Sequence, residues 1–193
     1  GYRGFFDGAF EAGQRSGSCN YDVACDETVG WEDQIPCVAV ISTGGSTFCT
    51  GFMVNNLRND RDPLFQTANH CGVNSGNAAS LVTFWNYQDP ADGPLDCPGN
   101  SIDSGPQDQF LSGSEFLASN AASDFTLVRL LQSPPDEWEV SYCGWSAEDV
   151  ATEFSVAIHH PATDLKRWSI DYEASEIYGY NQPGDTHIRV LDW

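Results

Sequence analysis

Short apolar runs, separated by clusters of Gly, Pro, Asn, Asp and Ser, recur along most of this chain and constrain its fold more than any other feature. Such spacing is typical of β-sandwiches and β-barrels. The runs at 35–42 and 47–54 flank the sequence Thr-Gly-Gly-Ser, which predicts a β-hairpin. The other expected strands are 64–68, 80–87, 124–131, 138–145, 153–160, 166–170 and 186–193.

Consecutive prolines interrupt this series in the sequence QSPPDE at 132–137, where no central strand can continue. No segment sustains a helical period, so we expect an all-β fold. The break divides the chain into two expected units, 19–132 and 133–193. Residues 1–18 are Gly-rich and lack a clear period, and they are predicted to be a leader, the remnant of a pro-segment or a linker.

The charge balance is strongly acidic, with 28 Asp and Glu against 8 Lys and Arg and a net charge of -20. This balance argues against binding to nucleic acid, whose phosphates attract basic side chains. It suits a secreted protein that must stay soluble, and it would attract cationic substrates, with solubility alone as the alternative explanation. No apolar run approaches the length of a membrane span, and no signal peptide is visible.

The seven cysteines are scattered, and none belongs to a C-x-x-C pair, which disfavours zinc-ribbon and thioredoxin-like functions. Scattered cysteines in an acidic chain with a single Met predict disulfide bonds and an oxidising compartment. Because seven is an odd number, one thiol is free or has its partner outside this sequence. The cysteines are Cys19, Cys25, Cys37, Cys49, Cys71, Cys97 and Cys143.

Two residues are candidates for catalysis by a hydrolase, which needs a nucleophile, a base and a carboxylate that orients the base. His70 follows an expected strand, so a loop would present it to a cleft. Asp124 opens an apolar strand, where its carboxylate would be partly desolvated. A structural histidine and a turn aspartate remain the alternatives for these two residues taken singly.

Three segments strongly resemble the chymotrypsin-like serine endopeptidases: CTGFMVNN at 49–56, FQTANHCG at 65–72 and SDFTLVRL at 123–130. Three others are similar to the bacterial lysyl endopeptidase branch: SGSCNYDVAC at 16–25, WNYQ at 85–88 and HHPATDLKR at 159–167. The similarity extends from about residue 16 to Trp193, and the motifs stand in the family's order.

The resemblance implies a double β-barrel, of which the second barrel is incomplete, and a secreted bacterial enzyme. It assigns the general base to His70 and the orienting acid to Asp124. The implied substrates are proteins or peptides cleaved after Lys, with Arg left open. No cofactor, metal, nucleic acid or membrane is implied, and we expect a monomer.

The family's nucleophilic serine lies after the strand that residues 186–193 resemble, together with the oxyanion-hole N–H groups and the acid of the specificity pocket. We therefore expect the chain to be a fragment that is inactive alone. Ser104 in the sequence DSGP echoes a nucleophile motif but has no following strand, and Ser46 and Ser114 sit in Gly-flanked turns. The rival interpretations are a non-catalytic homologue that acts as a binding module, and a second chain that completes the barrel.

The resemblance also implies two disulfide bonds, Cys49–Cys71 and Cys25–Cys97. Cys37 and Cys143 are extra to the family pattern, one in each expected barrel, and are candidates for a third bond. Cys19 remains, and its family equivalent bonds to a cysteine beyond the nucleophile.

The other histidines are expected to be structural. His159 and His160 are adjacent, so on a strand they face opposite sides and cannot bind one metal together. His187 is expected to form a hydrogen bond or to face solvent. Tyr178 or Tyr180 would line the substrate cleft by the family pattern, and core packing is the alternative.

Overall fold

The computed structural model describes residues 19–45, 47–98, 105–148, 150–179 and 184–191. In these ranges the regular structure consists of β-strands and one-turn 3₁₀ helices, and none of these helices is of a length and hydrophobicity that would cross a bilayer. The all-β prediction is therefore confirmed. The expected leader at 1–18 and the residues Ser46, Ser104 and Tyr180 lie outside the described ranges.

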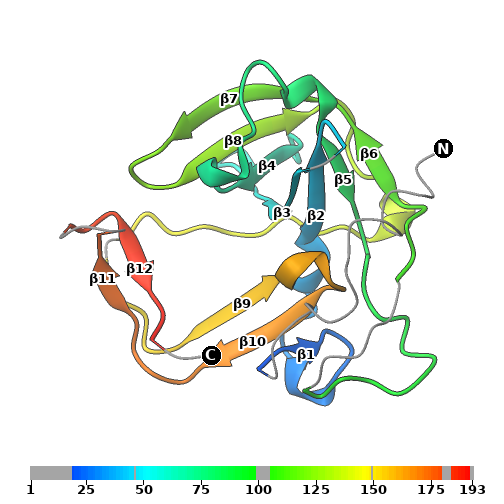
Figure 1. Ribbon diagram of the computed structural model, residues 1–193, viewed down its shortest axis with the longest axis vertical. Coiled ribbons are helices and arrows are strands. Elements are labelled where there is room, and N and C mark those ends of the chain that lie inside the picture. The colour runs from blue at the N-terminus through cyan, green and yellow to red at the C-terminus, as the bar shows by residue number, and fades with distance from the viewer. Residues whose placement is uncertain (1–18, 46, 99–104, 149, 180–183, 192–193) are drawn as a thin grey trace.

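Seven antiparallel strands form one curled sheet, drawn in the upper part of Figure 1, in the order β6-β5-β2-β3-β4-β8-β7. Their bounds are β2 Val38–Thr43, β3 Thr47–Met53, β4 Leu64–Thr67, β5 Val82–Phe84, β6 Phe110–Ser112, β7 Ser114–Asn120 and β8 Phe125–Leu130. Four of them lie within strands expected from the sequence at 47–54, 64–68, 80–87 and 124–131.

The predicted hairpin is present, and β2 and β3 pair with Ile41 opposite Cys49. Gly44 and Gly45 make its turn with φ angles of +57° and +77°, which glycine adopts without steric cost. The hairpin's first strand begins later than expected, because Ile35–Cys37 forms the 3₁₀ helix η3. Pro36 favours this start, since proline cannot donate to a strand ladder.

The remaining strands form a smaller second group in the lower part of Figure 1. Strands β1 (Tyr21–Asp22), β10 (Arg167–Asp171) and β9 (Ser155–His159) make one antiparallel sheet, and β11 (Glu176–Tyr178) pairs with β12 (His187–Arg189). Because β1 pairs with β10, the segment around Tyr21 joins the strands of the second group. The division of the chain at residues 132 and 133 stays a prediction.

Residues 138–145 do not form the expected strand. Asp136–Trp138 is the 3₁₀ helix η6, and the only described pairing in the segment is an isolated parallel bridge between Val54 and Cys143. The segment runs as an extended connection between the two groups of strands (Figure 1). Strands β6 and β7 were not expected, since SEFLASN in β7 is largely polar and mostly exposed. The other 3₁₀ helices are η2 Asp26–Thr28, η4 Asn69–Cys71, η5 Ala78–Ser80 and η7 Pro161–Thr163.

The main hydrophobic core lies inside the seven-stranded sheet, where Phe65 and Trp85 are fully buried and pack edge to face at 5.9 Å. Burying rings of this size contributes much of the stabilisation of a domain this small. A second cluster, around Val40 and Tyr87, includes Leu165, which follows the second group's strand β9. The two groups of strands therefore share apolar contacts.

Three disulfide bonds join distant parts of the described chain: Cys25–Cys97, Cys37–Cys143 and Cys49–Cys71. These are the two implied pairs and the candidate third pair. The Cys37–Cys143 bond fixes the connecting segment to the start of β2, and Cys19 is free.

Candidate active site

Strands β4 and β8 bring the two candidate catalytic residues together. They are antiparallel neighbours, and Thr67 at the end of β4 pairs with Thr126 near the start of β8. His70 lies three residues after Thr67, and Asp124 lies two residues before Thr126. An antiparallel register places the end of one strand beside the start of the next, so both residues reach the same edge of the sheet.

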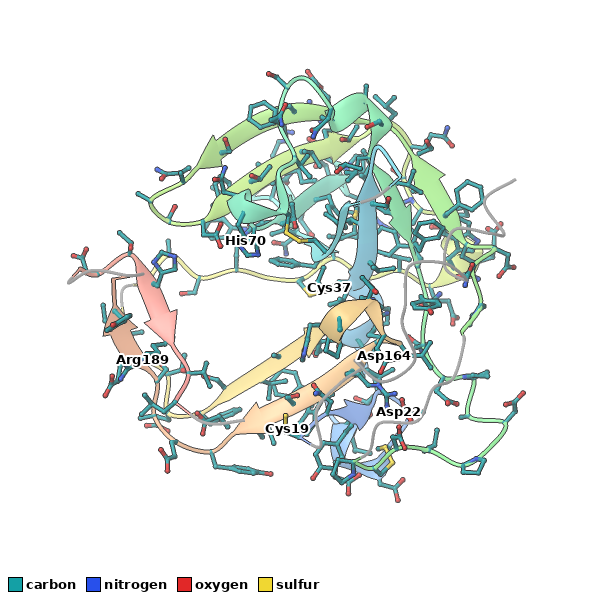
Figure 2. The ribbon with its side chains drawn as sticks, viewed as in Figure 1. Cys19, Asp22, Cys37, His70, Asp164 and Arg189 are labelled. Atoms are coloured by element: carbon teal, nitrogen blue, oxygen red, sulfur yellow. A yellow bond between two sulfur atoms is a disulfide. The ribbon has the colours of Figure 1, made fainter. Side chains whose placement is uncertain are left out.

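His70 and Asp124 form two hydrogen bonds. The imidazole Nδ1 lies 2.5 Å from Asp124 Oδ2, and the backbone N–H of His70 donates to Asp124 Oδ1 over 2.8 Å. Both carboxylate oxygens are therefore directed to the same residue, which fixes the carboxylate plane as well as the ring. In the view of Figure 2, His70 lies on the side of the seven-stranded sheet toward the second group of strands.

The backbone around the pair is also constrained. Asp124 was expected to open the strand, but it is the last residue of the turn before β8, with a φ angle of +49°. Its carbonyl accepts the Asn69 N–H over 3.0 Å, which continues the contact beyond the β4–β8 ladder. Non-glycine residues in this conformation are uncommon, and aspartate is among those that tolerate it.

The Cys49–Cys71 bond holds the other side of η4. It joins the residue after His70 to β3, the neighbour of β4 on the side away from β8. Gly72 ends η4 with a φ of +76°, a left-handed conformation that terminates the helix. The His70 backbone is thus held between β3 and the turn of Asp124.

The electrostatics of the pair favour an ionised carboxylate. Partial burial raises the pKa of Asp124, but hydrogen bonds from the His70 backbone N–H and imidazole, together with electrostatic attraction to His70 and the Asn69 N–H, lower it by more. The net pKa of this carboxyl lies below its ordinary value. An anion at Nδ1 selects the tautomer that carries its proton there and leaves Nε2 as an acceptor.

The exposure of the two side chains differs in the way a general base requires. The His70 side chain is 72% exposed and that of Asp124 is 31% exposed. The imidazole is therefore open to an incoming group while its anchor is partly shielded. Among the described residues, Asp124 is the hydrogen-bond partner of the His70 ring, and no serine hydroxyl is bound to it.

The sulfur chemistry argues against a metal site made of His70, Cys49 and Cys71. The Cys49 and Cys71 sulfurs lie close to His70, a grouping that could hold a metal if both were thiolates. They are bonded to each other instead. A metal ligand must be the deprotonated thiol, and a disulfide sulfur is not one.

His159, His160 and Ser114, also singled out in the sequence, make other contacts. His160 is buried, stacks on Tyr87 and bonds through Nδ1 to the Asp164 carbonyl. His159 lines a cavity of about 300 Å³ that Cys19 also lines. Ser114 Oγ is buried and donates to the Ala78 carbonyl, an arrangement unsuited to a nucleophile.

Tyr178 is partly exposed on β11, beneath the Arg189 guanidinium at 4.6 Å from the ring centre. Arg189 also pairs with Glu176 across the same hairpin. Tyr178 is therefore placed at the surface, and core packing is not its role.

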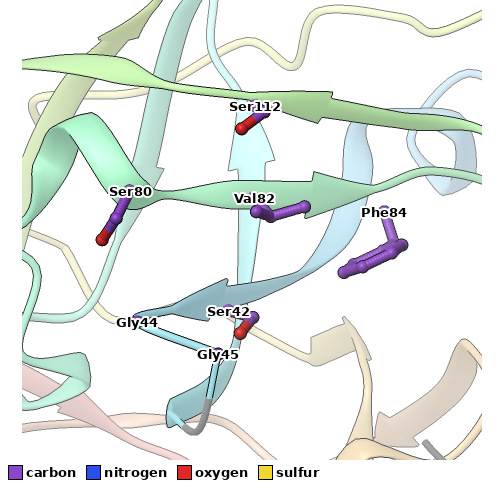
Figure 3. Close-up of a pocket in the computed structure, with 7 residues that line it drawn as sticks. All are labelled: Ser42, Gly44, Gly45, Ser80, Val82, Phe84 and Ser112. Carbon is purple, nitrogen blue, oxygen red and sulfur yellow. The ribbon is translucent and has the colours of Figure 1, made fainter. Parts of the chain in front are cut away.

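Two hollows not expected from the sequence lie on the seven-stranded sheet. The first has a volume of about 300 Å³ and lies on β2, β5, β6 and the turns beside them, as Figure 3 shows. The second, of about 590 Å³, lies over β4 and β8, with Phe125 and Trp145 among its lining residues. The residues that line each hollow come from several strands, so no single sequence motif could have predicted either hollow.

Comparison with known proteins places the chain in a family. Residues 13–193 match the family model described as lysyl endopeptidase, C-terminal domain. The lysyl endopeptidase of Pseudomonas aeruginosa is 31% identical over 98% of this chain, and the chain spans 42% of that relative's length. A crystal structure of the Rv3671c protease in its inactive form aligns over 89% of this chain and 70% of its own, with a TM-score of 0.44 and 14% identity. On the family match and the sequence identity, this chain belongs to the lysyl endopeptidase family.

Proposed function

We propose that this chain carries the base and the orienting acid of a secreted serine endopeptidase that cleaves peptide bonds after Lys. His70 is the general base and Asp124 is the residue that orients it. The attacking group is a serine hydroxyl, which the family pattern places after the strand that residues 186–193 resemble. The observation that carries the proposal is the doubly hydrogen-bonded pair of His70 and Asp124 at the shared end of β4 and β8.

In each half of the reaction His70 accepts a proton and then passes it on. Nε2 accepts the serine proton while the oxygen attacks the peptide carbonyl, and it then passes this proton to the departing amine. A water molecule, deprotonated by the same nitrogen, next attacks the acyl-enzyme, and His70 returns this proton to the serine oxygen as the carboxylic acid product leaves. In both halves of the reaction His70 becomes a cation, which the ionised Asp124 stabilises through its bond to Nδ1.

Substrate and location rest on separate support. A net charge of -20 attracts cationic peptides, which agrees with cleavage after a basic residue. The family to which the chain belongs is named for cleavage after Lys, and this supports Lys over Arg. Three disulfide bonds in the described residues support folding and persistence in an extracellular, oxidising environment.

The direct test is hydrolysis of matched peptides by the full-length protein. Three peptides would differ only in the residue before the scissile bond, as Lys, Arg or the neutral analogue norleucine, with the products identified by mass spectrometry. We expect cleavage after Lys that a serine-directed inhibitor abolishes. Failure to cleave any of the three peptides would instead support the non-catalytic binding module.

A further inference from the structure

The chain contains one lysine, Lys166, and the fold buries it completely. Its side chain is 0% exposed, and Nζ donates to the Ile35 carbonyl over 3.0 Å. The other basic residues are seven arginines. Arg58, on the loop after β3, has 72% of its side chain exposed. Burial is therefore not a general property of the basic residues in this fold.

The backbone at Lys166 is as inaccessible as the side chain. Its N–H donates to the Tyr87 carbonyl over 2.9 Å, so a segment beyond β5 holds it from one side. The next residue, Arg167, begins β10, the central strand of its sheet, with Asp22 of β1 and His159 of β9 as its partners. The peptide bond between Lys166 and Arg167 therefore enters a strand that is paired on both sides.

The residues around this bond are buried too. Leu165, Arg167 and Trp168 are at most 3% exposed. A protease binds several residues on each side of the bond it cuts in an extended form, so the whole segment would have to leave the fold first. Cleavage in native proteins concentrates instead at exposed loop tips, because those segments open at little cost.

An ion cluster resists this opening. The Arg167 guanidinium, with none of its side chain exposed, bonds to Asp22 at 2.5 Å and to Asp164 at 3.2 Å. Both carboxylates are labelled in Figure 2: Asp22 is the last residue of β1, and Asp164 directly follows η7. Pulling the segment out would leave two buried carboxylates without their counter-charge, which is strongly unfavourable.

Burial also changes the chemical character of Lys166, since desolvation lowers its pKa to about 7. A peptidase directed at lysine recognises an accessible ammonium group. In this fold the Lys166 amine is inaccessible, and its burial disfavours the charged ammonium form.

We propose that the fold protects the chain from cleavage by enzymes of its own specificity, by burying its one lysine directly before the central strand β10. The proposal rests on the proposed function, because self-cleavage is a hazard only if the parent protein cuts after Lys. The protection acts through the folded state, so the bond after Lys166 is cut only when the segment around β10 unfolds.

The test uses a separate lysine-specific endopeptidase as the probe and the purified full-length protein, with its own active site blocked by a serine-directed inhibitor, as the target. Digestion of the native protein is followed by reduction and mass spectrometry, which reads cleavage after Lys166. The reduced and alkylated protein is digested in parallel. The matched control is the variant Arg58→Lys, which places a lysine on an exposed loop.

We expect native cleavage after Lys166 to be at least about 1,000-fold slower than cleavage at the substituted position of Arg58→Lys, which is the scale of a folded-to-unfolded ratio. In the reduced protein the two bonds are expected to be cut at similar rates. Cleavage after Lys166 in the native protein at a rate near that of the control position would overturn the proposal.

The digestion experiment and the peptide-cleavage experiment can fail independently of each other. If the matched peptides are cleaved after Lys but native Lys166 is also cut, the protection fails and the function stands. If the peptides are not cleaved, the proposed function is wrong, and burial of Lys166 is then not a protection against self-cleavage.

Discussion

Thr67 and Thr126 lie opposite each other across β4 and β8, and this register sets the distance between His70 and Asp124. A shift of the pairing by one residue would turn the neighbouring side chains to the other face of the sheet. The register is fixed by burial, because Phe65 and Val128, also paired, are both fully buried in the core. The geometry of the candidate site thus depends on core packing at its base.

Replacing the carboxylate tests the role of Asp124. In Asp124→Asn the amide can still bond to His70 but carries no negative charge, so the ring loses the anion that selects its tautomer. We expect kcat to fall by about 10³–10⁴-fold with a small change in KM. The measurement is steady-state hydrolysis of a lysyl peptide by the full-length protein. Asp136→Asn, a change at an exposed carboxylate paired with Arg61, serves as the control and is expected to leave kcat unchanged.

The disulfide beside His70 is expected to matter for catalysis beyond its effect on stability. The double variant Cys49→Ala/Cys71→Ala frees η4 from β3, whereas Cys37→Ala/Cys143→Ala frees the connecting segment from η3 and the start of β2. Each is expected to lower the free energy of unfolding by about 2–4 kcal/mol. At a temperature where both variants remain folded, only the first should reduce kcat strongly. Equal losses of kcat would mean that the bond does not position His70.

Because Lys166 is buried, we expect the free energy of unfolding to rise at alkaline pH. Burial lowers its pKa to about 7 from the ordinary 10.5, so the unfolded chain binds a proton that the folded chain does not. The contribution is present in full above pH 10.5 and is lost as pH falls toward 7. The free energy of unfolding is therefore expected to rise by roughly 2–4 kcal/mol across this window.

The control for this rise is Lys166→Met, which keeps much of the side-chain volume and cannot take a proton. Urea unfolding at a series of pH values should give a flatter profile for the variant than for the parent protein. The same pH slope in both proteins would show that other groups cause it.

The pairing of His70 with Asp124 was predictable because each residue lies in a short local motif. TANHC around His70 and SDFTLVRL around Asp124 needed no knowledge of distant contacts. The hairpin of β2 and β3 was predictable for the same reason, since its two glycines lie between two apolar runs.

Two features that the sequence did not predict, the connection at 138–145 and the burial of Lys166 and Arg167, depend on contacts that are remote in sequence. Residues 138–145 contain strand-forming side chains, yet a disulfide and a single bridge to Val54 hold them as a connection. Strand β7 carries few apolar residues and forms through its pairing with β8. Burial of Lys166 and Arg167 runs against the usual exposure of charged residues, and the partners that permit it, Ile35 and Asp22, lie more than 100 residues away.

The central claim is that His70, held by Asp124, is the base of a serine endopeptidase, and removal of the imidazole tests it most directly. The measurement is kcat/KM for a lysyl peptide with the full-length protein and its His70→Ala variant, after thermal unfolding has shown that both are folded. We predict a loss of at least about 10⁴-fold in kcat/KM, as expected when a member of such a triad is removed. A folded variant that keeps a kcat/KM within a factor of ten of the parent would contradict the account.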